Sequence, residues 1–429
     1  MSPFLPPKNI KLGVIGLGYV GLPLAVALGS AFDTLGFDTN SNRVTALQTG
    51  SDATGEVEVD EFKNAEFLRF SADEDDLASC DVFIVAVPTP IDNSQRPDLK
   101  PLISASEAVG RAISKGGVVI YESTVYPGAT EEDCIPIVEK ISGLKFNVDF
   151  FAGYSPERIN PGDKTRPLRK IVKVTSGSTP EVADFVDSIY SRIIDAGTFK
   201  ASSIRVAEAS KIIENTQRDV NIALINELSI IFSHLNIDTN EVLDAAATKW
   251  NFIPLRPGLV GGHCIGVDPY YLVHKSSSVG FIPDIIRTAR EINDGMARNA
   301  VGRLVKAMVT RNLPVKGSKV LVVGCTFKEN CPDIRNTKVV DLLAELRGWG
   351  VDPVVVDTWA SSDEVLAEYG FELGTSLPQS TGFDAIILAV PHEDVVARGP
   401  GHLRALLKPG GVLFDMKAAF ALDASELRL

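Results

Sequence analysis

The feature that most constrains this chain is a glycine-rich turn close to its start. Gly16-Leu17-Gly18-Tyr19-Val20-Gly21 directly follows an apolar run, Lys11–Ile15, and opens a second apolar segment. In such a turn the first glycine permits a tight bend, the second lets the backbone approach a pyrophosphate, and the third lets a helix pack closely on a strand. The spacing therefore predicts the strand, turn and helix of a Rossmann-type nucleotide-binding unit.

An acidic residue completes this pattern. Asp38 ends the next apolar run, Thr34–Asp38, 22 residues after Gly16. A carboxylate there accepts hydrogen bonds from an adenosine ribose and repels a 2′-phosphate, which favours NAD over NADP. Arg43, just beyond, is either a residue that stacks on adenine or an ordinary surface arginine. The predicted NAD-binding residues of this turn are Gly16, Gly18, Tyr19, Val20, Gly21, Asp38 and Arg43.

The same stretch has the length of a membrane span. Leu12–Phe32 contains no charged residue over 21 positions, which is enough for a helix to cross a bilayer. Its glycines and Pro23 would interrupt a lipid-facing helix, whereas a strand, a turn and a buried helix use them naturally. We therefore expect no membrane segment here.

The overall composition argues against several other classes of protein. The 42 Lys and Arg residues against 55 Asp and Glu give a net charge of −13, which disfavours a nucleic-acid partner. The five cysteines are too few and too scattered for a disulfide framework, and none forms a C-x-x-C zinc pair. We expect a cytoplasmic protein without a metal site. Four of the cysteines are expected to be small buried hydrophobes: Cys80, Cys134, Cys325 and Cys331.

Strand-like runs alternate with helical stretches along most of the chain, which indicates βαβ units and parallel sheets. The predicted strands are Lys11–Ile15, Thr34–Asp38, Val82–Val87, Val118–Tyr121, Phe150–Gly153, Lys319–Val323, Pro353–Asp357, Ala385–Val390 and Val412–Asp415. Between the two series, Ser202–Leu235 has a helical period without glycine or proline. We predict an α/β fold with a nucleotide-binding domain over 1–200, a central helical region over 201–312 and a second α/β domain over 313–429.

Two further strand ends carry hydroxyl groups. Val87-Pro88-Thr89-Pro90 and Glu122-Ser123-Thr124 each follow a predicted buried strand. Ligands of open α/β sheets collect at this carboxyl edge. Thr89 and Thr124 are therefore candidate cofactor-binding residues, and the alternative is a proline-kinked turn and a helix cap.

A cysteine in a glycine-rich segment is the second chemical feature. In Gly261-Gly262-His263-Cys264-Ile265-Gly266-Val267-Asp268 the flanking glycines leave room for a substrate to approach the thiol. A thiolate is nucleophilic and forms covalent intermediates with carbonyl compounds. Asp268 is near enough to orient a partner or a water, so Cys264 is a candidate nucleophile. The alternative is an inert buried cysteine.

The long helix offers complementary groups. Lys211 and Asn215 lie four residues apart and share a face with Glu208 and Arg218. A lysine stabilises an oxyanion, and an asparagine holds a water or hydroxyl; a solvated helix face is the alternative. Glu157, which follows Pro156 in a loop, is a candidate general base, and the alternative there is an exposed loop glutamate.

These motifs, taken in order, resemble the UDP-glucose/GDP-mannose dehydrogenase family over nearly the whole chain. Phe327-Lys328 and Asp333-Ile334-Arg335 complete the resemblance. It implies an NAD-dependent, four-electron oxidation of a nucleotide sugar at C6, from primary alcohol to carboxylate. It also implies an N-terminal NAD domain, a C-terminal UDP-binding domain and a long central helix at a homodimer interface.

Two departures from the family pattern indicate a branch. UDP-glucose enzymes typically carry a lysine where this chain has Val267, and often a second glutamate where it has Pro161. The remaining motif looks like the UDP-N-acetylhexosamine 6-dehydrogenases of bacterial surface-polysaccharide synthesis. UDP-N-acetylglucosamine is the expected substrate and UDP-glucose the alternative. Pro161 leaves the final hydrolysis without its second glutamate.

The resemblance also implies roles for individual residues. The implied catalytic residues are Cys264, Lys211, Asp268, Asn215, Glu157 and Thr124. The implied substrate-binding residues are Glu157, Arg158, Lys211, Asn215, Arg256, Gly261 and Lys328, while Arg335 is assigned to the cofactor. Two rivals stay open: a two-electron hydroxy-acid dehydrogenase on the same plan, and a noncatalytic NAD- or nucleotide-sensing protein.

Overall fold

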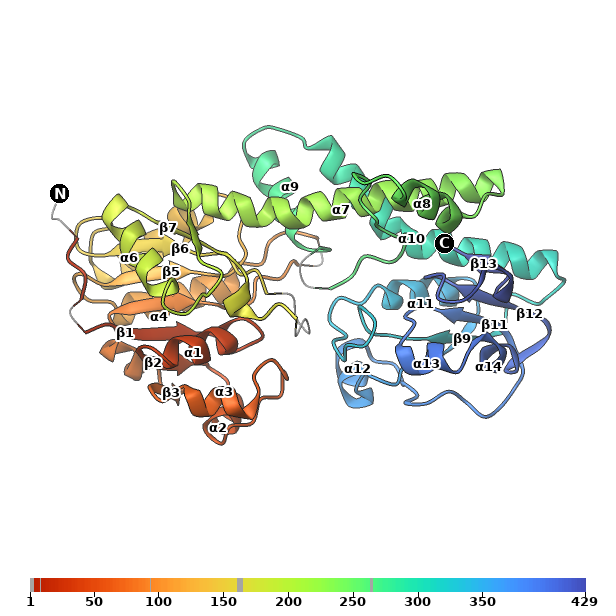
Figure 1. Cartoon of the computed structure of the whole chain (residues 1–429), viewed down its shortest axis with the longest axis horizontal. Helices are drawn as coiled ribbons and strands as arrows, with labels where there is room; N and C mark the ends of the chain where they lie inside the picture. Colours follow the sequence, from red (N-terminus) through yellow and green to blue (C-terminus); the bar gives the residue numbers. More distant parts are fainter. Residues whose placement is uncertain (1–3, 8, 93, 160–164, 263–264) are drawn as a thin grey trace. The chain divides into compact units, whose positions relative to one another are not determined.

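The computed structural model describes residues 4–7, 9–92, 94–159, 165–262 and 265–429 (Figure 1). The chain divides into two compact units, Met1–Glu214 with Tyr270–Phe281, and Asn215–Pro269 with Ile282–Leu429. Helix α7 (Ile204–Leu235) is continuous through the point of division. Each unit contains a largely or wholly parallel sheet with helices, which confirms the predicted α/β class. The division into three domains stays a prediction.

The first unit contains an eight-stranded sheet in the order β3-β2-β1-β4-β5-β6-β7-β8. Its strands are β1 (Lys11–Ile15), β2 (Asp33–Phe37), β3 (Leu68–Ser71), β4 (Val82–Val85), β5 (Val118–Tyr121), β6 (Phe151–Tyr154), β7 (Lys173–Gly177) and β8 (Thr198–Lys200). Described neighbours pair in parallel except β6 with β7. The strand order reverses between β1 and β4, which is where ligands bind in such sheets.

The helices of this unit explain the uncharged stretch near the start. Every residue of α1 except Pro23 is buried, and α1 packs with β1 in one apolar core. Leu12–Phe32 is therefore a core strand and a core helix, as expected. No helix within the described residues is long and apolar enough to cross a membrane. The helices are α1 (Gly21–Gly29), α2 (Ser41–Gln48), α3 (Val59–Asn64), α4 (Lys100–Ala112), α5 (Ile135–Ser142) and α6 (Pro180–Tyr190), with α9 (Asp268–Ser278) beginning in the second unit and ending in this one.

The second unit contains a five-stranded parallel sheet in the order β10-β9-β11-β12-β13. Its strands are β9 (Lys319–Val323), β10 (Asp352–Val356), β11 (Phe383–Leu388), β12 (Leu407–Asp415) and β13 (Leu427–Arg428). This is the 2-1-3-4-5 order of flavodoxin-like sheets, whose ligand crevice opens between the strands that correspond to β9 and β11.

Helices cover both faces of this second sheet. Val320 and Val322 of β9 belong to one apolar cluster with α10 and α11, whereas Leu321 and Val323 belong to another with α13 and α14. This alternation is expected of a strand that is buried on both sides. The helices are α8 (Thr239–Ala247), α10 (Asp284–Thr310), α11 (Val339–Gly348), α12 (Ser362–Tyr369), α13 (Glu393–Ala397) and α14 (Pro400–Arg404).

Candidate active site

The three glycines of the first turn have three different environments. Gly16 has φ +93°, and a Cβ there would lie 2.9 Å from the Ala86 carbonyl oxygen. A Cβ on Gly21 would lie 1.8 Å from the Gly16 carbonyl oxygen, whereas a Cβ on Gly18 would meet nothing within 4 Å. The turn is thus tight at Gly16, closely packed at Gly21 and open at Gly18, as an approaching pyrophosphate requires. This geometry fits NAD.

Asp38 and Arg43 both support this turn. Asp38 accepts hydrogen bonds from the N–H groups of Leu17 and Asn40, each at 2.9 Å. Arg43 Nε donates to the Leu17 carbonyl oxygen at 3.1 Å, and the guanidinium pairs with Asp52 at 2.7 Å. Arg43 therefore supports the Leu17 backbone from its own unit, and its stacking on adenine stays a prediction.

The hydroxyl-bearing strand ends lie at the same sheet edge. β4 lies between β1 and β5, so the residues that follow these three strands share the carboxyl edge. Thr89 and Thr124 are both partly buried there. The neighbouring Ser123 hydroxyl donates to the Val87 carbonyl oxygen at 2.7 Å and joins the two strand ends. The edge next to the glycine turn is therefore polar and ordered.

Glu157 is buried, so the alternative of an exposed loop glutamate is wrong. Its side chain is 7% exposed; one carboxylate oxygen accepts from the Ile159 N–H, and the other has no partner within the described residues. Lys173 Nζ donates at 3.1 Å to the carbonyl oxygen of Pro156, directly before Glu157. The loop that carries the candidate base is therefore anchored to β7 through the Lys173 side chain.

Lys173 belongs to a buried polar network that the sequence reasoning missed. Its ammonium pairs with Glu122 at 2.7 Å, with both side chains at most 2% exposed, and the Tyr190 hydroxyl donates to the same carboxylate. Burial raises the pKa of Glu122, while the attraction of Lys173 opposes that rise. Glu122, Lys173 and Tyr190 come from separate segments, and no local pattern marks them as partners.

Three arginines that were predicted to bind ligand have partners inside their own units. Arg158 pairs with Glu214 at 2.7 Å and donates to the Val172 carbonyl oxygen. The other pairs are Arg256 with Asp244, and Arg335 with Asp333 at 2.6 Å. Their ligand contacts stay predictions. Pro161 lies outside the described residues.

The polar stripe of α7 is mostly buried. Glu208, Lys211 and Asn215 are 0%, 6% and 5% exposed, so the solvated-face alternative is wrong for these three and holds for Arg218. In the first unit Glu208 accepts from the N–H groups of Gly128 and Thr130. Burial raises the pKa of Glu208 to about 7 against these hydrogen bonds.

In the second unit, two of the predicted catalytic residues contact each other. The side-chain amide of Asn215 donates to Asp268 at 2.6 Å, and Asp268 is 2% exposed at the first position of α9. The two residues are 53 apart in the sequence. Cys264, the predicted nucleophile, lies outside the described residues. The other four cysteines are buried, as expected, and burial raises the pKa of both Cys134 and Cys325 to about 12.

A pocket in the second unit lies against the carboxyl end of β9. Gly261 must be a glycine, because a Cβ there would lie 2.7 Å from the Asn336 carbonyl oxygen. Lys328 places its ammonium 5.4 Å from the centre of the Phe327 ring. The lining of the pocket includes Gly261, Thr326, Phe327, Lys328, Lys338 and Lys417. Lys338 pairs with Asp294 at 3.0 Å and with Asp341 at 2.8 Å, and Glu329 also lines the pocket. Lys328 and Lys417 are therefore the candidates for binding an anion such as a diphosphate.

The dinucleotide turn and the two α/β units define an NAD-dependent dehydrogenase. The chain belongs to the UDP-glucose/GDP-mannose dehydrogenase family, whose NAD binding domain, central domain and UDP binding domain match residues 10–194, 205–295 and 321–421.

Relatives match along the full length of the chain. It is 58% identical over 423 residues to a UDP-N-acetyl-D-glucosamine 6-dehydrogenase of Pseudomonas aeruginosa, with 98% of this chain and 100% of that protein covered. An enzyme of the same name from Salmonella typhi is 51% identical over 421 residues, with 98% and 99% covered. The structure of a UDP-D-ManNAc dehydrogenase from Pyrococcus horikoshii matches with a TM-score of 0.87 at 28% identity, covering 96% of each chain.

Proposed function

We propose that this protein oxidises UDP-N-acetylglucosamine at C6 to the uronic acid, in two successive two-electron steps. The observation that carries the chemistry is the buried contact between Asn215 and Asp268, a residue that follows Cys264 by four positions in the sequence. The substrate is supported by the two relatives that are more than half identical over the full length. NAD, when bound at the Gly16–Gly21 turn, would supply the hydride acceptor; each step reduces one NAD, so two NAD are consumed for each sugar.

The first step needs a base and a cation. We assign removal of the C6 hydroxyl proton to Lys211, acting directly or through a water held by Asp268. The protonated Lys211 then stabilises the oxyanion that forms whenever C6 becomes tetrahedral. A positioned group of this kind contributes about 3–4 kcal/mol in measured cases.

The second step needs a covalent hold on the aldehyde. The Cys264 thiolate adds to C6 and forms a thiohemiacetal, which keeps the aldehyde from escaping. Oxidation of this adduct gives a thioester. Water then attacks C6, the carbon–sulfur bond breaks, and the carboxylate leaves while the thiolate is restored. Glu157 is the base for this water, and Thr124 and Asn215 position it.

The pocket beside β9 is the proposed site of the UDP moiety. Lys328 and Gly261 line it, and the ammonium groups of Lys328 and Lys417 suit the diphosphate. Arg256 and Arg158 are further candidates for substrate contacts, and Arg335 is a candidate for the cofactor. We place the reaction in the cytoplasm, where cysteines stay reduced, and its product serves surface-polysaccharide synthesis.

We further infer a homodimer. In the second unit Leu224, Ile231 and Leu235 of α7 are 54%, 45% and 59% exposed. Spacings of seven and four residues place them on one helix face. An apolar stripe of this kind typically packs against another protein surface. Sedimentation velocity is expected to give twice the mass of the chain, and a monomer at micromolar concentration would contradict the inference.

Substitution of Cys264 tests the mechanism. Cys264→Ser is expected to fold and to retain the first oxidation. It should lose the second oxidation, because a serine hydroxyl is a much weaker nucleophile than a cysteine thiolate. Full four-electron turnover by this variant would exclude the thioester. A hydroxy-acid dehydrogenase would not depend on the thiol, and a noncatalytic sensor would bind UDP-N-acetylglucosamine in a calorimeter without forming NADH.

A further inference from the structure

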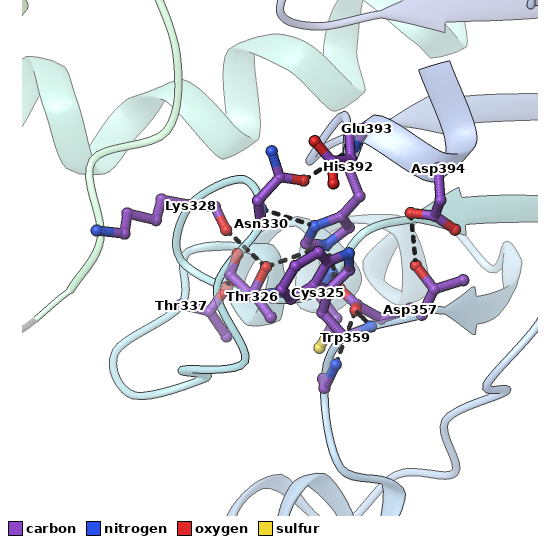
Figure 2. Close-up of polar contacts among 12 residues, drawn as sticks. Cys325, Thr326, Lys328, Asn330, Thr337, Asp357, Trp359, His392, Glu393 and Asp394 are labelled. Carbon is purple, nitrogen blue, oxygen red and sulfur yellow. Dashed lines mark hydrogen bonds and ion pairs between the residues drawn. The ribbon is translucent and has the colours of Figure 1, made fainter. Parts of the chain in front are cut away.

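A buried histidine joins three strand ends at the crevice of the second sheet. His392 follows β11, Asp357 follows β10 and Thr326 follows β9. His392 Nε2 lies 3.0 Å from Asp357 Oδ2 and 3.2 Å from Thr326 Oγ1 (Figure 2). The exposed fractions of these three residues are 0%, 2% and 1%. None of these three residues belongs to a motif that the sequence shows.

The hydrogen bonds assign the proton of this imidazole. The Asn330 N–H donates to His392 Nδ1 at 3.0 Å, so Nδ1 is the acceptor and the proton sits on Nε2. The Nε2–H therefore points to Asp357 and the Thr326 hydroxyl, and that hydroxyl donates to the Lys328 carbonyl oxygen at 2.9 Å. One ring thus holds both ends of the turn 326–330, with Lys328 between them.

Asp357 has the same place in the second sheet as Asp38 in the first. Asp38 accepts from the Leu17 N–H after β1, and Asp357 accepts from the Cys325 and Thr326 N–H groups after β9, at 2.6 and 3.2 Å. Asp357 differs because protein side chains bury it. His392 hydrogen-bonds to it, and the Trp359 ring stacks on the His392 ring with 5.9 Å between the ring centres. Burial alone would raise the pKa of Asp357, but His392 and the backbone N–H groups lower it to about 2.

The buried Asp357 carboxylate also accepts hydrogen bonds from the backbone that follows it. Its second oxygen accepts from the N–H groups of Trp359 and Ala360, at 2.7 and 2.9 Å. Lys328 and Phe327, in contrast, line the pocket. His392 and Asp357 therefore fix the conformation of the turn 326–330, whereas residues of that turn line the pocket.

We propose that His392 is a positioning residue for the nucleotide-sugar: it fixes the turn 326–330 so that Lys328 and Phe327 face the diphosphate. This inference rests on the proposed function, because it takes the pocket to be the UDP site. An unrestrained lysine side chain samples many rotamers. When the turn is fixed at both ends, the Lys328 backbone is held in place, and its ammonium can reach fewer positions. Loss of His392 should then weaken UDP binding and leave NAD binding unchanged.

Two near-isosteric variants separate the contributions of the two ring nitrogens of His392. His392→Asn retains an acceptor where Nδ1 lies and loses the Nε2 donor that faces both Asp357 and Thr326. His392→Gln retains a donor where Nε2 lies and loses the acceptor for Asn330. Each is expected to raise the KM for UDP-N-acetylglucosamine and the Kd for UDP by roughly fivefold, the effect of one lost hydrogen bond. The KM for NAD and kcat should stay within about twofold. His392→Ala loses the contacts of both ring nitrogens and should raise the KM and Kd more than either of the other two variants.

Thr358→Ala is the matched control. It removes a neighbouring hydrogen bond, from the Thr358 hydroxyl to Asp394 at 3.0 Å. Among the described contacts, neither of these two side chains bonds to the turn 326–330. It is expected to keep the wild-type KM. If the His392 variants do not fold, Thr326→Val should weaken UDP binding, and Thr326→Ser, which keeps the hydroxyl, should recover most of that affinity.

Unchanged UDP affinity in the folded His392 variants would overturn the inference, as would equal affinities for Thr326→Val and Thr326→Ser. A parallel rise in the KM for NAD would also overturn it, because that result indicates a general loss of structure. Failure of the proposed function is a separate result: the wild-type protein would then form no NADH from UDP-N-acetylglucosamine.

Discussion

The buried pair of Lys173 and Glu122 is the residue-scale feature with the clearest energetic consequence. Removing one member of a buried ion pair leaves the other charge without compensation, which costs about 3–5 kcal/mol. Lys173→Met should therefore lower the free energy of unfolding by about that amount, as measured by urea denaturation. The double variant Glu122→Gln/Lys173→Met removes both charges and should recover much of the loss. Equal stabilities for the single and double variants would show that the uncompensated Glu122 charge is not the cause of the loss.

The glycine turn offers a matched pair of substitutions. Gly18→Ala adds a methyl group into open space, so stability should change by less than about 0.5 kcal/mol, while the Kd for NAD should rise roughly tenfold because the pyrophosphate approaches there. Gly21→Ala forces a Cβ to 1.8 Å from a carbonyl oxygen and should destabilise the fold by about 3 kcal/mol. Thermal unfolding and NAD titration separate the two effects. A stable Gly21→Ala protein would contradict the packing argument.

Residues that belong to a local pattern could be predicted from the sequence. The three glycines and Asp38 lie within one strand–turn–helix–strand unit, so their spacing alone indicates their roles. Lys173 and His392 could not be predicted in this way, because their partners Glu122 and Asp357 are 51 and 35 residues distant. Their pairing arises only when the strands that precede or carry them come together.

At the scale of elements, Glu208 ties α7 to the turn that begins at Gly128. Its pKa is about 7 in the folded protein against an ordinary value of 4.5. A raised pKa in the folded state contributes stability that is complete below pH 4.5 and is lost as the pH rises through about 7. The free energy of unfolding should therefore fall by about 3 kcal/mol across this window, at 1.4 kcal/mol per pKa unit. Glu208→Gln removes the titrating group and should abolish this part of the pH dependence; an unchanged slope would contradict the assignment.

The strands β1, β2, β4, β5 and β6 and the strands β9 to β12, including the edge strand β10, were predicted, whereas β3, β7, β8 and β13 were not. β1, β5 and β9 have the predicted bounds, and the strand predicted over Val82–Val87 ends at Val85. β3 and β8 lie at or near the edge, and none of their residues is fully buried. A continuous apolar run indicates a strand that is buried on both faces. β3 and β8 are not buried in this way, so their sequences lack the run from which a strand is predicted.

At the scale of the whole molecule, the chain carries one nucleotide-binding plan in each of its two units. In the first, the crevice is lined by glycines and an acidic residue that leave open space at Gly18. In the second, the corresponding acidic residue is covered by His392, and the pocket is lined instead by the turn that this histidine holds. The same plan thus serves a dinucleotide in one unit and, by our proposal, a nucleotide-sugar in the other.

The proposed reaction is a four-electron oxidation, and the amount of NADH formed for each sugar is its most direct measure. The purified protein is incubated with a limiting amount of UDP-N-acetylglucosamine and excess NAD, and NADH is measured at 340 nm together with the uronic acid formed. Two NADH are expected for each sugar converted, with no accumulated aldehyde. One NADH for each sugar, with the aldehyde as product, would contradict a four-electron oxidation.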